Sequence, residues 1–337
     1  MSDFKLPQFA DVIEAAARIA GQVRHTPVLA DPELDAQVKA SVFCKCENLQ
    51  AIGAFKLRGA SNAVLALSDA EAARGVLTHS SGNHGAALGL AARRRGIPAH
   101  IVVPENAPLV KLANMRSTGA VLHRCQANVQ AREASAAEVA RATGAVLIHP
   151  FENPLVIAGQ GTAALELLRE VPRLDALIAP VGGGGLISGC ALAAHGLDPD
   201  LAVFAAEPEG AADAFRAMQS GVREVNPVAD TICDGLRTGI GAINFAIMQQ
   251  HRVRVLTAND QEIIAAMRLA WERLRLLIEP SAAVTLAVLC KYPDQFADRR
   301  VGLILSGGNV DLPGLPWAKQ ALDAATTPVA AVTDRTR

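Results

Sequence analysis

The sequence predicts an α/β fold built from open, twisted, mostly parallel sheets with helices on both faces. Between residues 75 and 149, short apolar runs alternate with longer segments of helical spacing, and helical crossovers of this kind connect parallel strands. In addition, glycine-rich or small polar stretches follow several apolar runs, at the strand ends where open α/β sheets bind ligands.

The first 74 residues predict three helices and one strand. Apolar residues recur at helical spacing over residues 8–20, and residues 41–46 alternate as a strand. A loop that runs into a helix is expected over residues 47–67. Ser68 and Glu71 then have the spacing of a capping box for the next short helix.

A compact smaller domain is expected at residues 75–147, where the alternation is most regular. The expected strands are 76–79, 99–103, 120–122 and 145–149, and the expected helices between them are 86–95, 107–117 and 127–143.

The larger domain is expected to be discontinuous, with residues 1–74 and 148–317. A glycine-rich loop is expected over residues 156–161, before a helix that ends at Glu170. The remaining expected elements are strands 177–181, 201–206, 253–256 and 301–305, a helix over 260–277 and another from Glu279. Residues 318–337 have no apolar period and are expected to be a disordered tail.

Composition argues against several classes of protein. The net charge is −1, and with one Tyr and two Trp there is no basic, aromatic-lined surface for nucleic acid. The N-terminus lacks the features of a signal peptide and no run of about 18 apolar residues occurs, so we expect a cytoplasmic protein without membrane contact. The six cysteines have no C-x-x-C spacing, which argues against a zinc site or disulfide framework.

Four consecutive glycines, Gly182 to Gly185, lie between an apolar strand and an apolar helix. Backbone N–H groups without neighbouring Cβ atoms can converge on a phosphate at the positive end of a helix. Neither the dinucleotide nor the P-loop glycine pattern fits this stretch. The sequence therefore favours a small phosphate ester here over a merely tight structural turn.

Lys56 follows a glycine turn and opens an otherwise apolar helix, where the helix dipole opposes a cation. That position tends to lower the pKa of the amine, and an unprotonated lysine attacks carbonyl groups. Taken alone, the residue is better explained as a surface lysine whose stem covers apolar neighbours.

Small polar residues follow two other predicted strands. The stretch Ser80 to Gly85 offers hydroxyls, an amide and free N–H groups to a ligand, although one Ser or Asn there would serve simply as a helix cap. Ser306 and two glycines end the last strand. Elsewhere, the carboxylates of Glu207 and Asp213 can hold Mg²⁺ or Ca²⁺ through oxygen, or can simply lie near a helix N-terminus.

A phosphate cradle, a reactive lysine, a polar loop and a serine at a strand end are the parts needed to hold pyridoxal phosphate as an imine. Over roughly residues 10–312 the sequence resembles the fold type II pyridoxal-phosphate enzymes, which have a two-lobe fold like that of tryptophan synthase β. Within them it is most similar to the threonine/serine dehydratases and serine racemases. The motifs that carry this resemblance are Ala54 to Ala60, Ser80 to Gly85, Gly182 to Gly185 and Ser306 to Asn309.

The resemblance implies roles for the matching residues. Lys56 would form the Schiff base, with Phe55 against the cofactor ring. The other implied cofactor contacts are Asn83 at the phenolic oxygen, Gly182, Gly183, Gly184 and Gly185 at the phosphate, Ser306 at the pyridine nitrogen, and Gly235. The implied substrate contacts are Ser80, Ser81, Gly82 and His84. Glu207, Asp213 and the Ala211 carbonyl match the divalent-cation site of the same subgroup.

The activity implied first is an ammonia-lyase that converts L-threonine or L-serine to a 2-oxo acid and ammonia, with Lys56 taking the Cα proton before the β-hydroxyl leaves. The alternatives are serine racemisation, because Ser81 matches the residue that acts on the opposite face in racemases, and dehydration of another β-hydroxy amino acid such as 3-hydroxyaspartate or phenylserine. Phe151 stands where animal-type racemases have Asn, which favours dehydration. A non-catalytic ligand sensor is the alternative outside the enzymes, and the intact Lys56 argues against it. A homodimer is expected.

Overall fold

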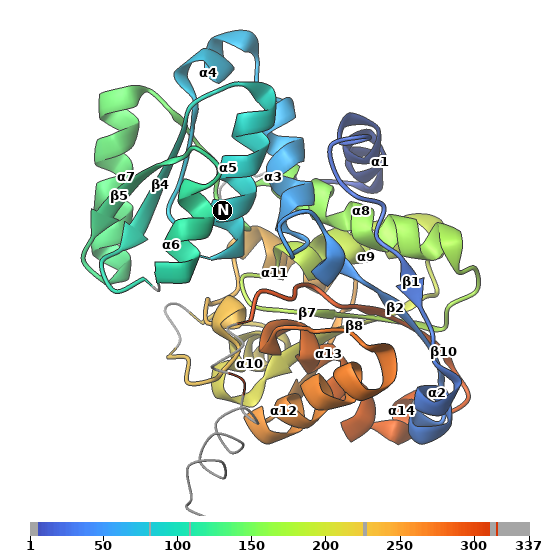
Figure 1. The fold of residues 1–337 in the computed structure, drawn as a ribbon. Coiled ribbons are helices and arrows are strands. Elements are labelled where there is room, and N and C mark those ends of the chain that lie inside the picture. Colours follow the sequence, from blue (N-terminus) through green and yellow to red (C-terminus); the bar gives the residue numbers. More distant parts are fainter. Residues whose placement is uncertain (1–5, 81, 108, 225–227, 311–314, 316–337) are drawn as a thin grey trace, which may run out of the picture.

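The structure, a computed structural model, describes residues 6–80, 82–107, 109–224, 228–310 and residue 315. Its larger sheet has six strands in the order β1-β2-β10-β7-β8-β9 (Figure 1). These strands are β1 (Val28–Leu29), β2 (Ser41–Lys45), β7 (Ala176–Pro180), β8 (Ala202–Pro208), β9 (Arg254–Ala258) and β10 (Arg300–Ile304). Only β1 runs antiparallel to its neighbour among these described strands.

A second sheet has four parallel strands in the order β5-β4-β3-β6, at the upper left of Figure 1. They are β3 (Val76–Thr78), β4 (Ala99–Pro104), β5 (Val121–Cys125) and β6 (Val146–Leu147). The predicted mostly parallel α/β fold is therefore confirmed. All four strands fall within residues 75–147, and the division into two domains at those boundaries stays a prediction.

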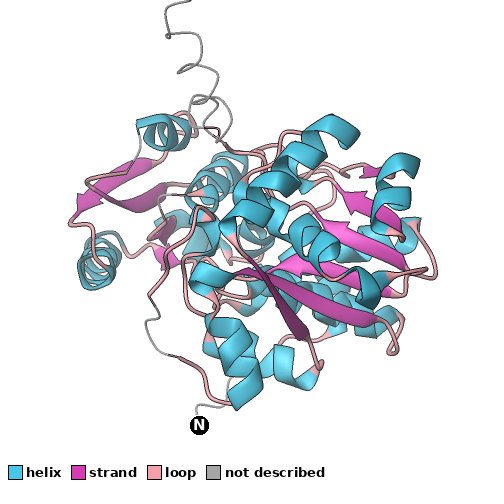
Figure 2. Cartoon of the chain, turned by 90° about the horizontal axis from the view of Figure 1, so that it is seen from below, coloured by secondary structure: helices cyan, strands magenta, loops and turns pink. Residues whose placement is uncertain are grey.

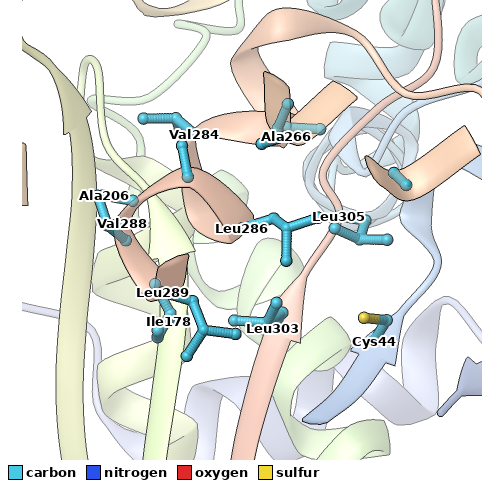
Figure 3. Close-up of a cluster of buried hydrophobic side chains, with 14 of the residues drawn as sticks. Cys44, Ile178, Ala206, Ala266, Val284, Leu286, Val288, Leu289, Leu303 and Leu305 are labelled. Carbon is cyan, nitrogen blue, oxygen red and sulfur yellow. The ribbon is translucent and has the colours of Figure 1, made fainter. Parts of the chain in front are cut away.

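Helices cover both faces of the larger sheet (Figure 2). One face packs against α2 (Pro32–Val38), α12 (Asp260–Leu269), α13 (Pro280–Lys291) and α14 (Pro293–Phe296). The other packs against α1 (Phe9–Arg18), α8 (Pro154–Glu170), α9 (Gly185–Leu197), α10 (Asp213–Ser220) and α11 (Ala242–Gln250). Figure 3 shows the first of these cores, with Leu286 and Leu289 of α13 near Ile178 of β7 and Leu303 of β10. Strands buried on both faces explain the nearly continuous apolar runs of β7 and β10.

Helices also flank the smaller sheet. Val76 and Ala99 pack on α5 (Asn83–Arg95), while Leu77 and Val102 face α7 (Val129–Thr143). The short α4 (Asp69–Arg74) begins with the predicted capping box, in which the Ser68 side chain accepts from the Glu71 N–H. The remaining helix of this part is α6 (Leu109–Arg116).

Helix α3 (Lys56–Leu65) contacts both α5 and α8 and so lies between the two sheets. The contact with α8 is close, because a Cβ added at Gly159 would lie 2.6 Å from the Gly59 Cα. A Cβ at Gly161 would lie 2.5 Å from the Gly189 carbonyl oxygen on α9. The predicted glycine-rich loop over residues 156–161 is therefore wrong, since these residues lie inside α8 and their glycines let three helices approach closely.

The helix predicted over residues 260–277 is also shorter than expected. Regular α-helix ends at Leu269, a π turn covers Ala270–Leu274, and Arg275 ends it with a left-handed φ of 57°. No described helix is long and apolar enough to cross a membrane, and the expected cytoplasmic location stays a prediction. The expected disordered tail, residues 318–337, lies outside the described residues.

Candidate active site

The predicted motifs meet at the carboxyl ends of strands. The glycine run, Gly182 to Gly185, follows β7, and Ser306 follows β10, which is the direct neighbour of β7 in the larger sheet. The turn before Lys56 lies against the Ser306 segment, because the Phe55 N–H donates to the Ser306 carbonyl at 2.9 Å. Lys56 and Ser306, 250 positions apart in number, therefore lie in neighbouring segments.

Lys56 is the first residue of α3, and its side chain is partly exposed. Its Nζ donates to the Pro150 carbonyl oxygen at 2.9 Å and lies 5.1 Å from the centre of the Phe55 ring. Burial lowers the pKa of Lys56 from 10.5 to about 8, because an ammonium group loses hydration there. Lys56 therefore has the properties of a nucleophilic amine near neutral pH.

The glycine run has no room for side chains. A Cβ at Gly184 would lie 2.7 Å from the Asn244 Cβ, and Gly184 also has a left-handed φ of 91°. A Cβ at Gly183 would overlap the Phe151 ring. The Gly183 carbonyl oxygen accepts from the Gly241 N–H at 3.1 Å and from Asn244 Nδ2 at 2.7 Å. With its carbonyl held in this way at the start of α9, the loop suits an anion at the helix N-terminus.

One short segment, residues 149–152, touches both the lysine and the glycine run. Pro150 accepts the hydrogen bond from Lys56, and the ring of the next residue, Phe151, lies against Gly183. The His149 ring meets the Phe151 ring edge-on at 4.6 Å between centroids, and its Nδ1 accepts from the Glu152 N–H at 2.9 Å. The amine and the proposed phosphate cradle thus contact the same two neighbouring residues.

The polar loop after β3 leads into α5, and its side chains make hydrogen bonds other than those of a helix cap. Asn83 is the first residue of α5, and its Nδ2 donates to Glu279 Oε1 at 2.9 Å. The Ser80 hydroxyl oxygen accepts from the Gly82 N–H at 3.4 Å. The predicted catalytic Ser81 lies outside the described residues.

Gly235 and Ser306 complete the predicted set. Gly235 lies beside the glycine run, since a Cβ at Gly182 would come within 2.9 Å of the Leu236 Cα. The Gly235 N–H donates to the Ser281 hydroxyl at 3.0 Å, and Ser306 is 2% exposed. Lys56, the glycine run, Gly235 and Ser306 are therefore gathered around one site, while the role of each stays a prediction.

Comparison with known proteins agrees with this arrangement. The family model described as "Pyridoxal-phosphate dependent enzyme" matches residues 19–307. The chain belongs to this family. Within the family, the chain is similar to enzymes that act as lyases or racemases.

Three similar proteins illustrate the range. The β-hydroxyaspartate dehydratase of Paracoccus denitrificans (strain Pd 1222) is 46% identical over 312 residues, which cover 93% of this chain and 99% of that protein. The L-threo-3-hydroxyaspartate ammonia-lyase of Saccharomyces cerevisiae is 42% identical, over 91% of this chain and 94% of that one. The crystal structure of the Dictyostelium discoideum serine racemase has a TM-score of 0.87 at 45% identity, covering 91% of this chain and 99% of that one.

The residues present fit the cofactor of a pyridoxal-phosphate dependent enzyme. At Gly182, Gly183 and Gly184 a Cβ would come within 3.0 Å of a neighbouring atom, so the loop stays free of side chains, as a phosphate-binding loop requires. Lys56, whose amine has the lowered pKa, contacts residues 150–151, which also contact that cradle. Pyridoxal phosphate needs a lysine at its aldehyde end and an anion site at its phosphate end. Here the lysine and the proposed anion site contact the same segment.

Arg58, which sequence reasoning missed, anchors the helix that carries Lys56. Its side chain is fully buried, and its guanidinium donates to Glu47 at 2.7 and 2.8 Å and to Glu166 at 2.7 and 2.8 Å. The buried Lys45 ammonium also pairs with Glu166, at 2.8 Å. Bidentate pairs fix orientation well, so Arg58 ties α3 to α8 and to the turn that follows β2. An arginine in an otherwise apolar helix was the available signal.

His84, a predicted substrate contact, is 2% exposed. Its Nε2 lies 3.2 Å from the Ile148 carbonyl oxygen, and its Nδ1 has no hydrogen-bond partner in the described part of the chain. Burial lowers the pKa of His84 well below its ordinary value, and the nearby Lys56 adds to this effect. The ring is therefore neutral at pH 7, and its contact with a substrate stays a prediction.

The predicted cation site has two buried carboxylates. Glu207 accepts from the Ala214 and Phe215 N–H groups at 2.9 and 2.8 Å, and Asp213 accepts from the Ile240 N–H at 2.8 Å. Burial raises the pKa of Glu207 to about 8, and the pKa of Asp213 is raised for the same reason. No group of three His, Cys, Asp or Glu side chains suited to a metal occurs in the described ranges. A bound cation would lower the cost of burying these two carboxylates in their charged form, so the pair fits a cation site.

The lowered pKa of Lys56 predicts how cofactor capture depends on pH. At a pKa of about 8, about one tenth of the amine is unprotonated at pH 7 and about nine tenths at pH 9. Since the unprotonated form is the nucleophile, we expect the capture rate to rise with pH up to about 9 and then level off. Stopped-flow absorbance of apoprotein with pyridoxal phosphate measures this rate, with N-acetyl-lysine amide as control. A rate that keeps rising toward pH 10.5 would contradict the lowered pKa.

Proposed function

We propose that the chain is a pyridoxal-phosphate dependent lyase that eliminates water from 3-hydroxyaspartate and releases ammonia. The observation that carries the proposal is the contact of residues 150–151 with both Lys56 and Gly183. The substrate is supported by two similar proteins, at 46% and 42% identity, that are named for hydroxyaspartate. These relatives favour the alternative reading of the sequence over dehydration of threonine or serine.

Each residue has a task in holding the cofactor. Lys56 would bind its aldehyde carbon, Phe55 would pack on its ring, and the glycine run would bind its phosphate through N–H groups. Ser306 would face the pyridine nitrogen with a neutral hydroxyl. When bound, pyridoxal phosphate supplies an electron sink that makes the Cα–H of an attached amino acid acidic.

Lys56 is also the base that the reaction needs. With a pKa near 8, its amine can take the Cα proton at neutral pH and can return a proton as the β-hydroxyl leaves as water. The unsaturated amine that results then takes up water and loses ammonia. In total, 3-hydroxyaspartate gives one 2-oxo dicarboxylic acid, oxaloacetate, and one ammonia, because the water that leaves is balanced by the water that hydrolyses the amine.

A panel of β-hydroxy amino acids tests the substrate. The holoprotein is incubated with 3-hydroxyaspartate, serine, threonine and phenylserine, and 2-oxo acid, ammonia and the configuration of the remaining substrate are measured. We expect kcat/KM for one diastereomer of 3-hydroxyaspartate to exceed that for serine and threonine by at least about tenfold, which corresponds to about 1.4 kcal/mol. Equal or higher values for threonine would contradict the proposed substrate.

Serine racemisation is the second candidate. It is supported by the serine racemase structure with a TM-score of 0.87, and the predicted role of Ser81 keeps it open. In the same panel, racemisation would appear as D-serine formed without 2-oxo acid. Phe151 stands where animal-type racemases have Asn, which favours elimination.

Two further parts of the proposal concern the cation and the assembly. We expect Mg²⁺ or Ca²⁺ to bind at Glu207, Asp213 and the Ala211 carbonyl and to raise the melting temperature, and Asp213→Asn to remove that rise. An equal rise in the variant would exclude this site.

The expected homodimer is tested by light scattering of the holoprotein, where a monomer mass would contradict it.

A further inference from the structure

Three side chains from distant parts of the sequence meet beside the Lys56 turn. Asn83 begins α5, Glu279 is the residue before α13, and Asn309 follows β10. Glu279 is 5% exposed, and its Oε1 would lie 2.5 Å from a Cβ at Gly307, so the carboxylate fills the space that this glycine leaves. A buried carboxylate is costly unless it accepts hydrogen bonds, and here it accepts them from both amide residues.

The orientation of the Asn309 amide is set by the backbone. Its Nδ2 donates to the Ile52 carbonyl oxygen at 2.8 Å, and a carbonyl can only accept. The same Nδ2 donates to Asn83 Oδ1 at 3.0 Å. Asn309 therefore presents a donor, and not an acceptor, to Asn83.

The orientation of the Asn83 amide follows from its two neighbours. Its Oδ1 accepts from Asn309, and its Nδ2 donates to Glu279 Oε1 at 2.9 Å. A flipped amide would place Oδ1 against the carboxylate and Nδ2 against the Asn309 amide nitrogen. Both of those contacts are repulsive, so only one orientation satisfies the three groups.

We propose that Glu279 is a positioning residue that, together with Asn309, holds the Asn83 amide in the orientation that offers its second Nδ2 hydrogen to the phenolic oxygen of the cofactor. The inference rests on the proposed use of pyridoxal phosphate. Asn83 Nδ2 lies 2.9 Å from Glu279 Oε1 and 3.3 Å from Oε2, so the two oxygens share one of its two hydrogens and the other is left for the cofactor. Without this lock, the amide could equally present its oxygen, which would repel the phenolate.

Both carboxylate oxygens are needed for the lock. Oε1 accepts from Asn83 Nδ2, and Oε2 accepts from the Asn309 backbone N–H at 3.2 Å. In Glu279→Gln, one of these oxygens becomes an NH2 group and faces another donor. Asn309→Asp replaces the donor toward Asn83 by an acceptor and keeps the size of the side chain. Glu272→Gln is the matched control, because Glu272 is exposed and pairs with Arg268 on the surface.

The test measures the cofactor dissociation constant and the pH midpoint of the visible absorption of the bound cofactor. A donor to the phenolate stabilises the anion and lowers its proton affinity, so losing the donor raises the midpoint. For Glu279→Gln and Asn309→Asp we expect about tenfold weaker cofactor binding and a midpoint about one pH unit higher. Glu272→Gln should match the wild type. Thermal melting of each apoprotein confirms that the variants fold.

A double-mutant cycle separates positioning from a purely structural role. If Glu279 acts through Asn83, Glu279→Gln should change neither readout further in an Asn83→Ala background. Additive effects, or unchanged binding and midpoint in both single variants, would overturn the inference. Wild-type protein that does not bind pyridoxal phosphate at all would instead overturn the proposed function on which the inference rests.

Discussion

Lys56→Ala is expected to abolish covalent attachment of pyridoxal phosphate and to lower kcat by at least about 10³-fold, since the variant loses both the nucleophile and the base. The purified variant should lack the yellow colour of the bound cofactor. Absorbance spectra and the assay of 2-oxo acid measure the two effects. The substitution removes a half-buried side chain and its hydrogen bond to the Pro150 carbonyl oxygen, so the fold should persist.

Lys291→Ala serves as the control for this change. Lys291, the last residue of α13, pairs with Glu209 and Glu262, and its side chain is 24% exposed. We expect this variant to keep its colour and its activity within about twofold, since exposed ion pairs contribute little. A coloured, active Lys56→Ala protein would mean that another amine binds the cofactor and acts as the base.

Gly184→Ala is expected to weaken cofactor binding by at least about 100-fold, or about 2.7 kcal/mol. The new Cβ would lie 2.7 Å from the Asn244 Cβ, and the residue would have to keep a φ of 91° or shift the loop. Either movement displaces the N–H groups that are proposed to bind the phosphate. Fluorescence titration of the apoprotein with pyridoxal phosphate gives the dissociation constant.

Gly96→Ala separates the effect of backbone strain from the effect on the site. Gly96 has a similar φ of 74° at the end of α5, but a Cβ there would meet nothing within 4 Å. Both variants should lose about 1 kcal/mol of folding free energy, which is the ordinary cost of a left-handed residue with a side chain, and Gly184→Ala should lose more because its Cβ also meets Asn244. Only Gly184→Ala should lose cofactor affinity, and equal affinities in the two variants would argue against a phosphate cradle at the glycine run.

The parts of the site that sequence could predict are those with a local signature. Four consecutive glycines after an apolar strand have few physical uses besides holding an anion. A lysine at the start of an apolar helix becomes informative once it is combined with them. The capping box at Ser68 and Glu71 is similarly local. Such features depend on neighbours within a few positions, so a single chain suffices to find them.

What sequence reasoning missed depends on pairs that are far apart. Arg58 is recognisable only when Glu47 and Glu166 are seen on either side of it, and Glu279 only when Asn83 and Asn309 are beside it. The error at residues 156–161 has the same origin. Glycines favour a loop by local propensity, but close packing of α8 against α3 and α9 keeps them helical.

The central claim is that Lys56 and no other amine binds the cofactor. Reduction of the holoprotein with sodium borohydride, followed by mass mapping of its peptides, tests this claim most directly. The account predicts one phosphopyridoxyl group per chain, on the peptide that contains Lys56. The same group on a peptide with a different lysine, in protein that was active before reduction, would contradict it.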